Sequence, residues 1–254
     1  VEPIVLSRPI DPMVDCVAKA LLGSEAHKGL LVGFLNAVLK PAVAIVDVTL
    51  CNPSHDPQAR DEKWTVIDVT AQDARGWIYQ VDVQIALHAA LAERTLYNWA
   101  TLYYRSLHSG EDFTELKPVT SIWLVRGSLI PASSFYHHHF RVHDPGHGVC
   151  LTEHLQLHIL ETGKWRPPVG DVPRSEEDDW VDFFHNARRW TQLPDYLPQT
   201  PAWREAMTVL QGFSEEDKAF YAYQDRLNAQ RVQATFERSL QKAQQAEAEA
   251  RRNE

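Results

Sequence analysis

The chain has 254 residues, 44% of them hydrophobic, and a formal net charge of −9. This length and composition suffice for a buried core, so we expect one large domain or one domain with an appendage. The negative charge counts against tight nucleic-acid binding, although catalytic carboxylates add to it until a metal ion neutralises them. Three widely spaced cysteines with no Cys-x-x-Cys pair predict neither a disulfide framework nor a zinc site.

No membrane-spanning segment is predicted. The longest apolar run, over about residues 29–39, is shorter than the roughly 20 residues needed to cross a bilayer. The first residues, Val1-Glu2-Pro3, lack a basic region followed by an apolar stretch, so we predict no secretory signal. We therefore expect a cytoplasmic protein without a membrane partner.

The first predicted elements are two helices, a strand and a β-hairpin. Apolar residues near helical spacing predict a short and a longer helix over 15–39, with a break at Gly23-Ser24. A β-branched run predicts a strand over 43–50, followed by an exposed loop of turn-forming residues. Alternating polar and apolar residues in 63–72 and 77–86 flank a turn-like segment and predict a hairpin.

The remaining sequence predicts a long helix, three strands and a helical C-terminal region. The helix covers 87–108, and the strands, which complete a mixed sheet, cover 118–125, 135–142 and 154–160. A segment rich in Pro and Gly, 163–175, marks a boundary between a core at 1–165 and a helical region at 166–254. Helices are predicted over 180–190, 202–210 and 214–252, the last opened by a capping box at Ser214 and ending in a solvated tail.

The hairpin holds the residues with the clearest chemical pattern. Side chains alternate along strands, so Asp68 shares a face with its neighbours two residues away, and Asp82 shares one with Gln84. Folding the strands about residues 74–75 places the two aspartates opposite each other or one position apart. If they point to the same face they lie about 5 Å apart and repel, unless a divalent cation such as Mg²⁺ or Mn²⁺ compensates. The alternative is that each aspartate is solvated, or is paired with a basic side chain such as Lys63.

Two other polar clusters invite a functional reading. His137-His138-His139 resembles a metal-binding tract, but successive strand residues point to alternate faces, so a surface strand is the simpler interpretation. The acidic run at 176–179 follows Ser175, where negative charge complements a helix dipole. We interpret it as a helix cap rather than a metal site.

Several motifs in order resemble one nuclease family over about residues 11–165. They include Leu22-Gly23-Ser24-Glu25, Ile67-Asp68-Val69, Val81-Asp82-Val83-Gln84 and Arg94-Thr95-Leu96-Tyr97, followed by Gly110-Glu111-Asp112-Phe113. No single motif is specific, but their order and spacing together resemble the recombination-promoting nuclease and transposase-associated branch of the PD-(D/E)XK nuclease superfamily.

That resemblance implies an α/β, restriction-endonuclease-like core and Mg²⁺-dependent (or Mn²⁺-dependent) hydrolysis of DNA phosphodiester bonds, linked to recombination or mobile elements. Asp68 and Asp82 would be the two acids of the motif, with the Val83 carbonyl as a further metal ligand. Gln84 stands where lysine is usual in the superfamily, and Asp82 stands where this branch more often has glutamate.

The resemblance also raises a third acid and a phosphate-binding pair. Glu25 is the candidate acid, in competition with Asp11 and Asp15, and a helix-cap role is the alternative for each. Arg94 and Tyr97, one turn apart, are candidates for phosphate contact; the alternative is a surface salt bridge for Arg94 and a core position for Tyr97.

The C-terminal helices suggest a rival function. A catalytically inactive nuclease fold could act as an interaction module through its acidic helical C-terminus, and a homo-oligomer could form through the same helices. A sustained heptad is absent, because the apolar positions Leu227, Val232, Phe236 and Leu240 are too few for a coiled coil.

Overall fold

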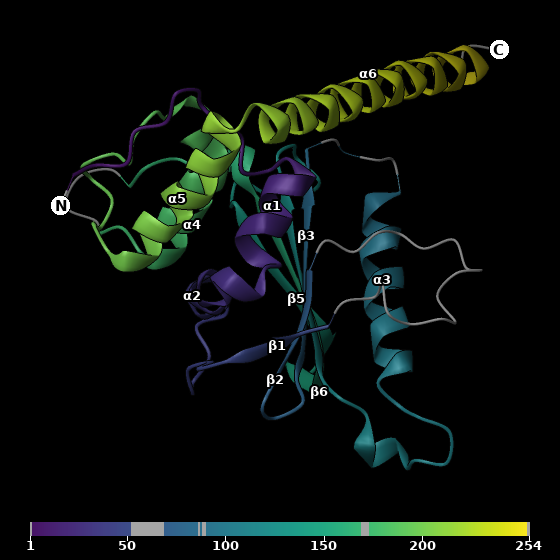
Figure 1. The fold of residues 1–254 in the computed structure, drawn as a ribbon. Coiled ribbons are helices and arrows are strands. Elements are labelled where there is room, and N and C mark those ends of the chain that lie inside the picture. The colour runs from purple at the N-terminus through teal and green to yellow at the C-terminus, as the bar shows by residue number, and fades with distance from the viewer. Residues whose placement is uncertain (1, 52–68, 86, 88–89, 169–172, 253–254) are drawn as a thin grey trace.

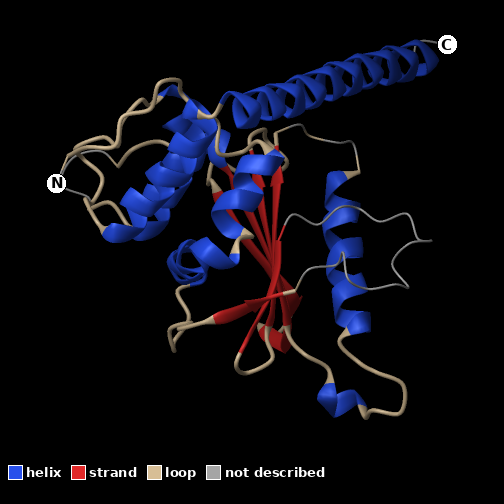
Figure 2. Ribbon diagram, viewed as in Figure 1, coloured by secondary structure: helices blue, strands red, loops and turns tan. Residues whose placement is uncertain are grey.

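The computed structural model describes residues 2–51, 69–85, 87, 90–168 and 173–252 (Figure 1). They form one six-stranded mixed sheet with helices on both faces, as the sequence predicted (Figure 2). No helix within these ranges is both long and apolar enough to span a membrane.

The strand order is β1-β2-β3-β4-β6-β5. The first three strands pair antiparallel, β3, β4 and β6 pair parallel, and β5 is antiparallel to β6. The carboxyl ends of β3 and β4 therefore lie at the same edge of the sheet. The bounds are β1 (Val48–Leu50), β2 (Val69–Asp73), β3 (Ile78–Gln84), β4 (Val119–Val125), β5 (His137–Asp144) and β6 (Val149–Glu161).

The predicted hairpin is confirmed for β2 and β3, whose turn is held by one side chain. Oδ1 of Asp73 accepts hydrogen bonds from the backbone N–H groups of Arg75 and Trp77, at 2.9 and 3.0 Å. Gly76 closes the turn with φ of +84°, a conformation that side chains other than glycine's rarely adopt. The first strand of this predicted hairpin, over 63–72, begins outside the described residues.

Helices of the N-terminal part cover one face of the sheet, and a single long helix covers the other (Figure 2). α1 (Asp15–Leu22) and α2 (Lys28–Leu39) pack with Tyr79, Val81 and Ile122 in the main core. α3 (Leu91–Arg105) lies on the opposite face, where its residue Leu91 packs in a small second cluster with Trp123.

The C-terminal helices extend the main core. α4 (Glu176–Asn186) and α5 (Pro201–Glu215) bring Trp180 and Trp203 together at 4.7 Å between ring centroids, and Trp180 lies 5.6 Å from Phe34 of α2. The core thus continues past the boundary expected at residue 165. Through these aromatic contacts the tryptophans attach α4 and α5 to the rest of the chain.

The last helix, α6 (Asp217–Arg252), begins beside α5 and projects away from the rest of the molecule (Figure 1). The capping box predicted at Ser214 is wrong. Ser214 is buried inside α5, and its Oγ accepts a hydrogen bond of 2.7 Å from the backbone N–H of Arg8. Tertiary packing of α5 decided this, because the local sequence alone looks like a helix start.

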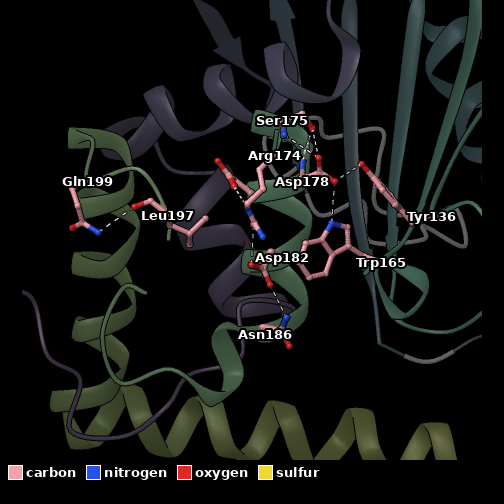
Figure 3. Close-up of polar contacts among 10 residues, drawn as sticks. Tyr136, Trp165, Arg174, Ser175, Asp178, Asp182, Asn186, Leu197 and Gln199 are labelled. Atoms are coloured by element: carbon pink, nitrogen blue, oxygen red, sulfur yellow. Dashed lines mark hydrogen bonds and ion pairs between the residues drawn. The ribbon is translucent and has the colours of Figure 1, made fainter. Parts of the chain in front are cut away.

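The acidic run at the start of α4 is a structural cap, as predicted (Figure 3). Ser175 and Asp178 form a capping box, and Asp178 also accepts hydrogen bonds from Tyr136 and from Trp165, both at 3.1 Å. The guanidinium of Arg174 pairs with Asp182 at 2.9 Å (Figure 3). It also pairs with Asp179 at 2.9 Å. These carboxylates are therefore engaged by the fold.

Candidate nuclease site

A row of buried polar side chains lies between the sheet and α3. Gln80 and Asp82 of β3 are both 0% exposed, which is unusual for such groups unless they have partners. Oγ of Ser121 donates to Oε1 of Gln80 at 2.8 Å and accepts from the indole N–H of Trp123 at 2.9 Å. The face of the sheet under α3 therefore combines a buried polar network with the small apolar cluster of Leu91 and Trp123.

Asp82 is the charged member of this row. Its Oδ1 accepts a hydrogen bond from the side-chain amide of Gln84, and its Oδ2 lies 3.9 Å from Nη2 of Arg94. The guanidinium of Arg94 in turn lies 5.5 Å from the ring centroid of Trp123. A buried carboxylate requires compensation, and here an amide and a guanidinium provide it.

Strand alternation explains why these groups face α3. Tyr79, Val81 and Val83 point into the main core, so the residues between them, including Asp82, point to the other face. Asp82 is in register with Trp123 of β4. The Val83 side chain is apolar and points into the main core. Of the groups of Val83, the backbone carbonyl oxygen is therefore the one that could ligate a metal.

Asp68, the other predicted acid, lies outside the described residues. The last described pair of the hairpin joins Val69 to Val81. In sequence, Asp68 directly precedes Val69 and Asp82 directly follows Val81. The predicted juxtaposition of the two aspartates stays a prediction.

The structure places Glu25 apart from this network. It lies in η1 (Glu25–His27), between α1 and α2 on the other face of the sheet, with its side chain 65% exposed and Oε2 4.0 Å from Nζ of Lys28. Its competitors are engaged elsewhere. Both carboxylate oxygens of Asp11 accept from the guanidinium of Arg126, at 2.7 and 2.8 Å, and Asp15 lies 3.9 Å from Arg226.

The predicted phosphate-binding pair on α3 is divided between the network and the surface. Arg94 is 24% exposed and belongs to the Asp82 network, so it is not a simple surface salt bridge. Tyr97 is 64% exposed, which excludes a core position. It lines an open, largely aromatic groove with Trp99, Tyr103, Tyr104 and Phe113.

The histidines of β5 and β6 contact one another and an acid of α4. His137 and His158 are hydrogen-bonded at 2.9 Å, His137 also contacts Glu177 at 2.6 Å, and His139 stacks on His158 with centroids 4.0 Å apart. Within the described ranges, no group of three or more His, Cys, Asp or Glu side chains could hold a metal ion. Burial, followed by the charges of His139 and His137, lowers the pKa of His158 to about 2, so this imidazole is neutral in the folded protein.

Two features of the site were missed by the sequence reasoning. The burial of Gln80 could have been expected, because it shares a face with Asp82 and Gln84 two and four residues later. The engagement of Asp11 by Arg126 spans 115 residues, and no local pattern announces it.

Comparison with known proteins agrees with the architecture. The model of the PD-(D/E)XK nuclease family transposases matches residues 12–236 of this chain. No curated protein and no solved structure gives a significant match. The mixed six-stranded sheet with flanking helices is consistent with the restriction-endonuclease-like α/β fold that the resemblance implied.

Membership in such a family indicates a nuclease or transposase-related function with DNA as the substrate. The match covers most of the chain and both halves of the β2–β3 hairpin that carries Asp82. The chain therefore belongs to the PD-(D/E)XK nuclease family transposases.

Proposed function

We propose that this protein is a metal-dependent DNA endonuclease whose active site is built on the β2–β3 hairpin. The observation that carries the proposal is the buried Asp82 carboxylate, held by Gln84 and faced by the Arg94 guanidinium. A buried carboxylate with a specific charged partner is a candidate functional group. The link to recombination or mobile elements rests on the family and belongs to the same proposal.

The donor set fits a hard divalent cation. Asp82, the Val83 carbonyl and Asp68 would hold Mg²⁺ or Mn²⁺, because carboxylate and carbonyl oxygens are the ligands these ions prefer. The distance of 3.9 Å between Nη2 of Arg94 and Oδ2 of Asp82 is too long for a hydrogen bond. The guanidinium and the carboxylate therefore interact mainly through charge. When bound, the ion would lower the pKa of a water molecule and neutralise charge on the attacked phosphate.

The protein's own residues would perform the remaining tasks. Gln84 fixes one oxygen of Asp82 and so orients the carboxylate. Arg94 supplies a positive charge beside the site, a charge that Gln84 lacks where the superfamily usually has lysine. Tyr97, exposed one turn further along α3, would contact the DNA backbone or a base. Glu25 would join the site as a third acid only if DNA or metal binding moves it.

Cleavage of plasmid DNA with Mg²⁺ or Mn²⁺ tests this function. Asp82→Asn and Asp68→Asn should each lower the rate by at least about 100-fold, because changes to groups that merely support metal ligands already cost about 10- to 100-fold. Asp112→Asn, which alters an exposed cap on the loop after α3, is the matched control and should cut DNA like the wild type. Cutting that survives both site changes would contradict the assignment.

A second proposal concerns the C-terminal helix. On α6, Val232, Phe236 and Leu240 are 70%, 69% and 49% exposed and follow one another at four-residue intervals. Apolar side chains at this spacing share one face of a helix, and such a face is commonly covered by a partner. We propose that a second copy of the chain covers it, so that the protein is a homo-oligomer. If the hairpin site is inactive, this helix is also the feature through which the protein would act as an interaction module.

A further inference from the structure

Positive side chains gather at the carboxyl edge of β4, on the side of the sheet that carries α1 and α4. Arg126 directly follows β4, His185 lies in the last turn of α4, and Arg188 and Arg189 lie in the following η6 (Ala187–Arg189). Burial comes first, but the charges of Arg188, Arg126 and Arg189 then further lower the pKa of His185. These four residues are named here the arginine cluster; its arginines are close enough to His185 for their charges to disfavour the protonated imidazole.

Asp11 is the acidic side chain that balances part of this charge. Both oxygens of Asp11 are engaged by the guanidinium of Arg126. Within the described part of the chain, Arg188 and Arg189 make no ion pair. In a protein of net charge −9, two adjacent arginines that make no ion pair with the described residues indicate an anionic ligand.

Buried donors in the cluster point to the same ligand. Nε of Arg126 and Nε of Arg188 are buried donors without a hydrogen-bond partner among the described residues, and Nδ1 of His185, a donor in one of the two imidazole tautomers, is buried and unpartnered as well. Leaving a buried donor without an acceptor costs about 1–3 kcal/mol. Phosphate oxygens are strong acceptors for guanidinium groups and would satisfy such donors after a small rearrangement.

A helix dipole explains only part of this arrangement. Basic residues in the last turn of a helix are stabilised by its negative end, which accounts for His185 and the two arginines of η6. It does not account for Arg126, which is contributed by a strand end. The other end of α4 is a useful contrast, because Arg174 there is neutralised by Asp179 and Asp182 (Figure 3).

The cluster lies at the same edge of the sheet as the candidate nuclease site, on the opposite face. The backbone N–H of Arg126 donates to the carbonyl oxygen of Gln84 at 3.0 Å, so the cluster begins beside the strand end that carries Asp82. Duplex DNA carries one negative charge per roughly 1.7 Å of its axis. A duplex with one phosphate at Asp82 would therefore present others along this edge.

We propose that the arginine cluster binds the phosphodiester backbone of DNA beside the phosphate that is cut. The inference rests on the proposed nuclease function, since that function brings DNA to this edge. The cluster contributes affinity and position but no sequence preference, as phosphate contacts do. It also explains how an acidic chain can hold DNA: the positive charge is concentrated at one place.

Binding and cleavage measured separately test the inference. Fluorescence anisotropy of a labelled 30-base-pair duplex in EDTA gives the affinity at several salt concentrations without cutting. The double variant Arg188→Gln/Arg189→Gln should bind every DNA sequence more weakly than the wild type does. The salt slope, meaning the change in the logarithm of the binding constant with the logarithm of salt concentration, should be smaller by up to about two, one for each lost phosphate contact.

The matched control removes the same charge at the opposite edge of the sheet. Arg75→Gln/Arg141→Gln alters the β2–β3 turn and a position on β5 that pairs with Gln156, which itself pairs with Thr120 near the start of β4. This control should keep the wild-type salt slope. A thermal melt of each variant separates binding from folding, because a purely capping role would lower the melting temperature and leave the slope unchanged.

Each result has one reading. An unchanged slope in the Arg188/Arg189 variant, with wild-type cutting intact, overturns the inference and leaves the nuclease function standing. A reduced slope with no cutting by the wild type supports binding of the DNA backbone by the cluster and overturns the nuclease function, and with it the placement beside a cut phosphate. A wild-type protein that neither binds nor cuts DNA overturns both.

Discussion

The guanidinium of Arg94, on α3, faces the buried carboxylate of Asp82, on β3, with Nη2 3.9 Å from Oδ2. This relationship connects the helix that covers one face of the sheet to the strand that carries the candidate site. It also places a positive charge beside the carboxylate at a position that the superfamily's usual lysine motif does not use. Arg94 and a divalent cation would compete for the charge of Asp82, which makes Arg94 an informative residue to change.

Replacing Arg94 with glutamine should separate metal binding from cleavage. Removing the guanidinium takes away the charge that competes for Asp82, so the Kd for Mg²⁺ measured by calorimetry should fall several-fold. The cleavage rate at saturating Mg²⁺ should also fall, by about 10- to 100-fold, because the charge next to the phosphate is lost. Arg105→Gln, about 16 Å further along the same helix, serves as the control. Equal changes in both variants would contradict a specific role for Arg94.

Replacing Asp11 with asparagine should destabilise the fold. The Asp11–Arg126 pair is largely buried, with side chains 7% and 17% exposed, and the change leaves Arg126 without its counter-charge. The free energy of unfolding, measured with urea, should fall by about 3 kcal/mol. Asp217→Asn breaks an ion pair with Arg8 whose acidic member is 76% exposed, so it should cost less than about 1 kcal/mol. Comparable losses in the two variants would show that burial of the first pair has no energetic consequence.

His158 should make the protein less stable in acid. Its pKa is lowered to about 2 in the folded state, whereas an unfolded histidine titrates near 6.5, so the unfolded chain binds the extra proton first. Above about pH 6.5 the neutral His158 makes its full contribution to the free energy of unfolding. As the pH is lowered below this value, the free energy of unfolding decreases by up to about 1.4 kcal/mol per pH unit.

The test compares the slope of unfolding free energy against pH, from pH 7 to pH 5, in two variants. His158→Gln should make this slope shallower by up to about 1.4 kcal/mol per pH unit, which corresponds to one bound proton. His147→Gln removes a histidine whose side chain is 81% exposed and should leave the slope as it is. The same slope in wild type and His158→Gln would show that this imidazole can be protonated in the folded protein.

Replacing Phe236 with aspartate should dissociate a homo-oligomer that forms through α6. The change puts a charge in the centre of the exposed apolar face, and light scattering after size-exclusion chromatography should show a lower mass. Thr235→Asp adds the same charge about 100° away from the centre of that face and should leave the mass unchanged. A wild-type protein that is monomeric at high concentration would refute the proposed self-association.

Much of the fold could be read from the sequence because its signals are local. Alternation around the Asp73 turn predicted β2 and β3, and the apolar spacing after residue 87 predicted α3. Prediction failed where a local pattern competed with packing. Ser214 has the neighbours of a helix cap, yet burial of the final turn of α5 placed it inside that helix.

By itself, the sequence determined which residues could be catalytic, because strand periodicity places Asp82 and Gln84 on one face and the core valines on the other. Only the tertiary structure decided what faces them. Arg94 faces Asp82 because α3 packs across β3, and the charge of Arg126 acts on Arg188 of η6 because α4 returns to the edge of β4. Such pairings depend on how elements distant in the sequence pack together. The charge and spacing of neighbouring residues do not predict that packing.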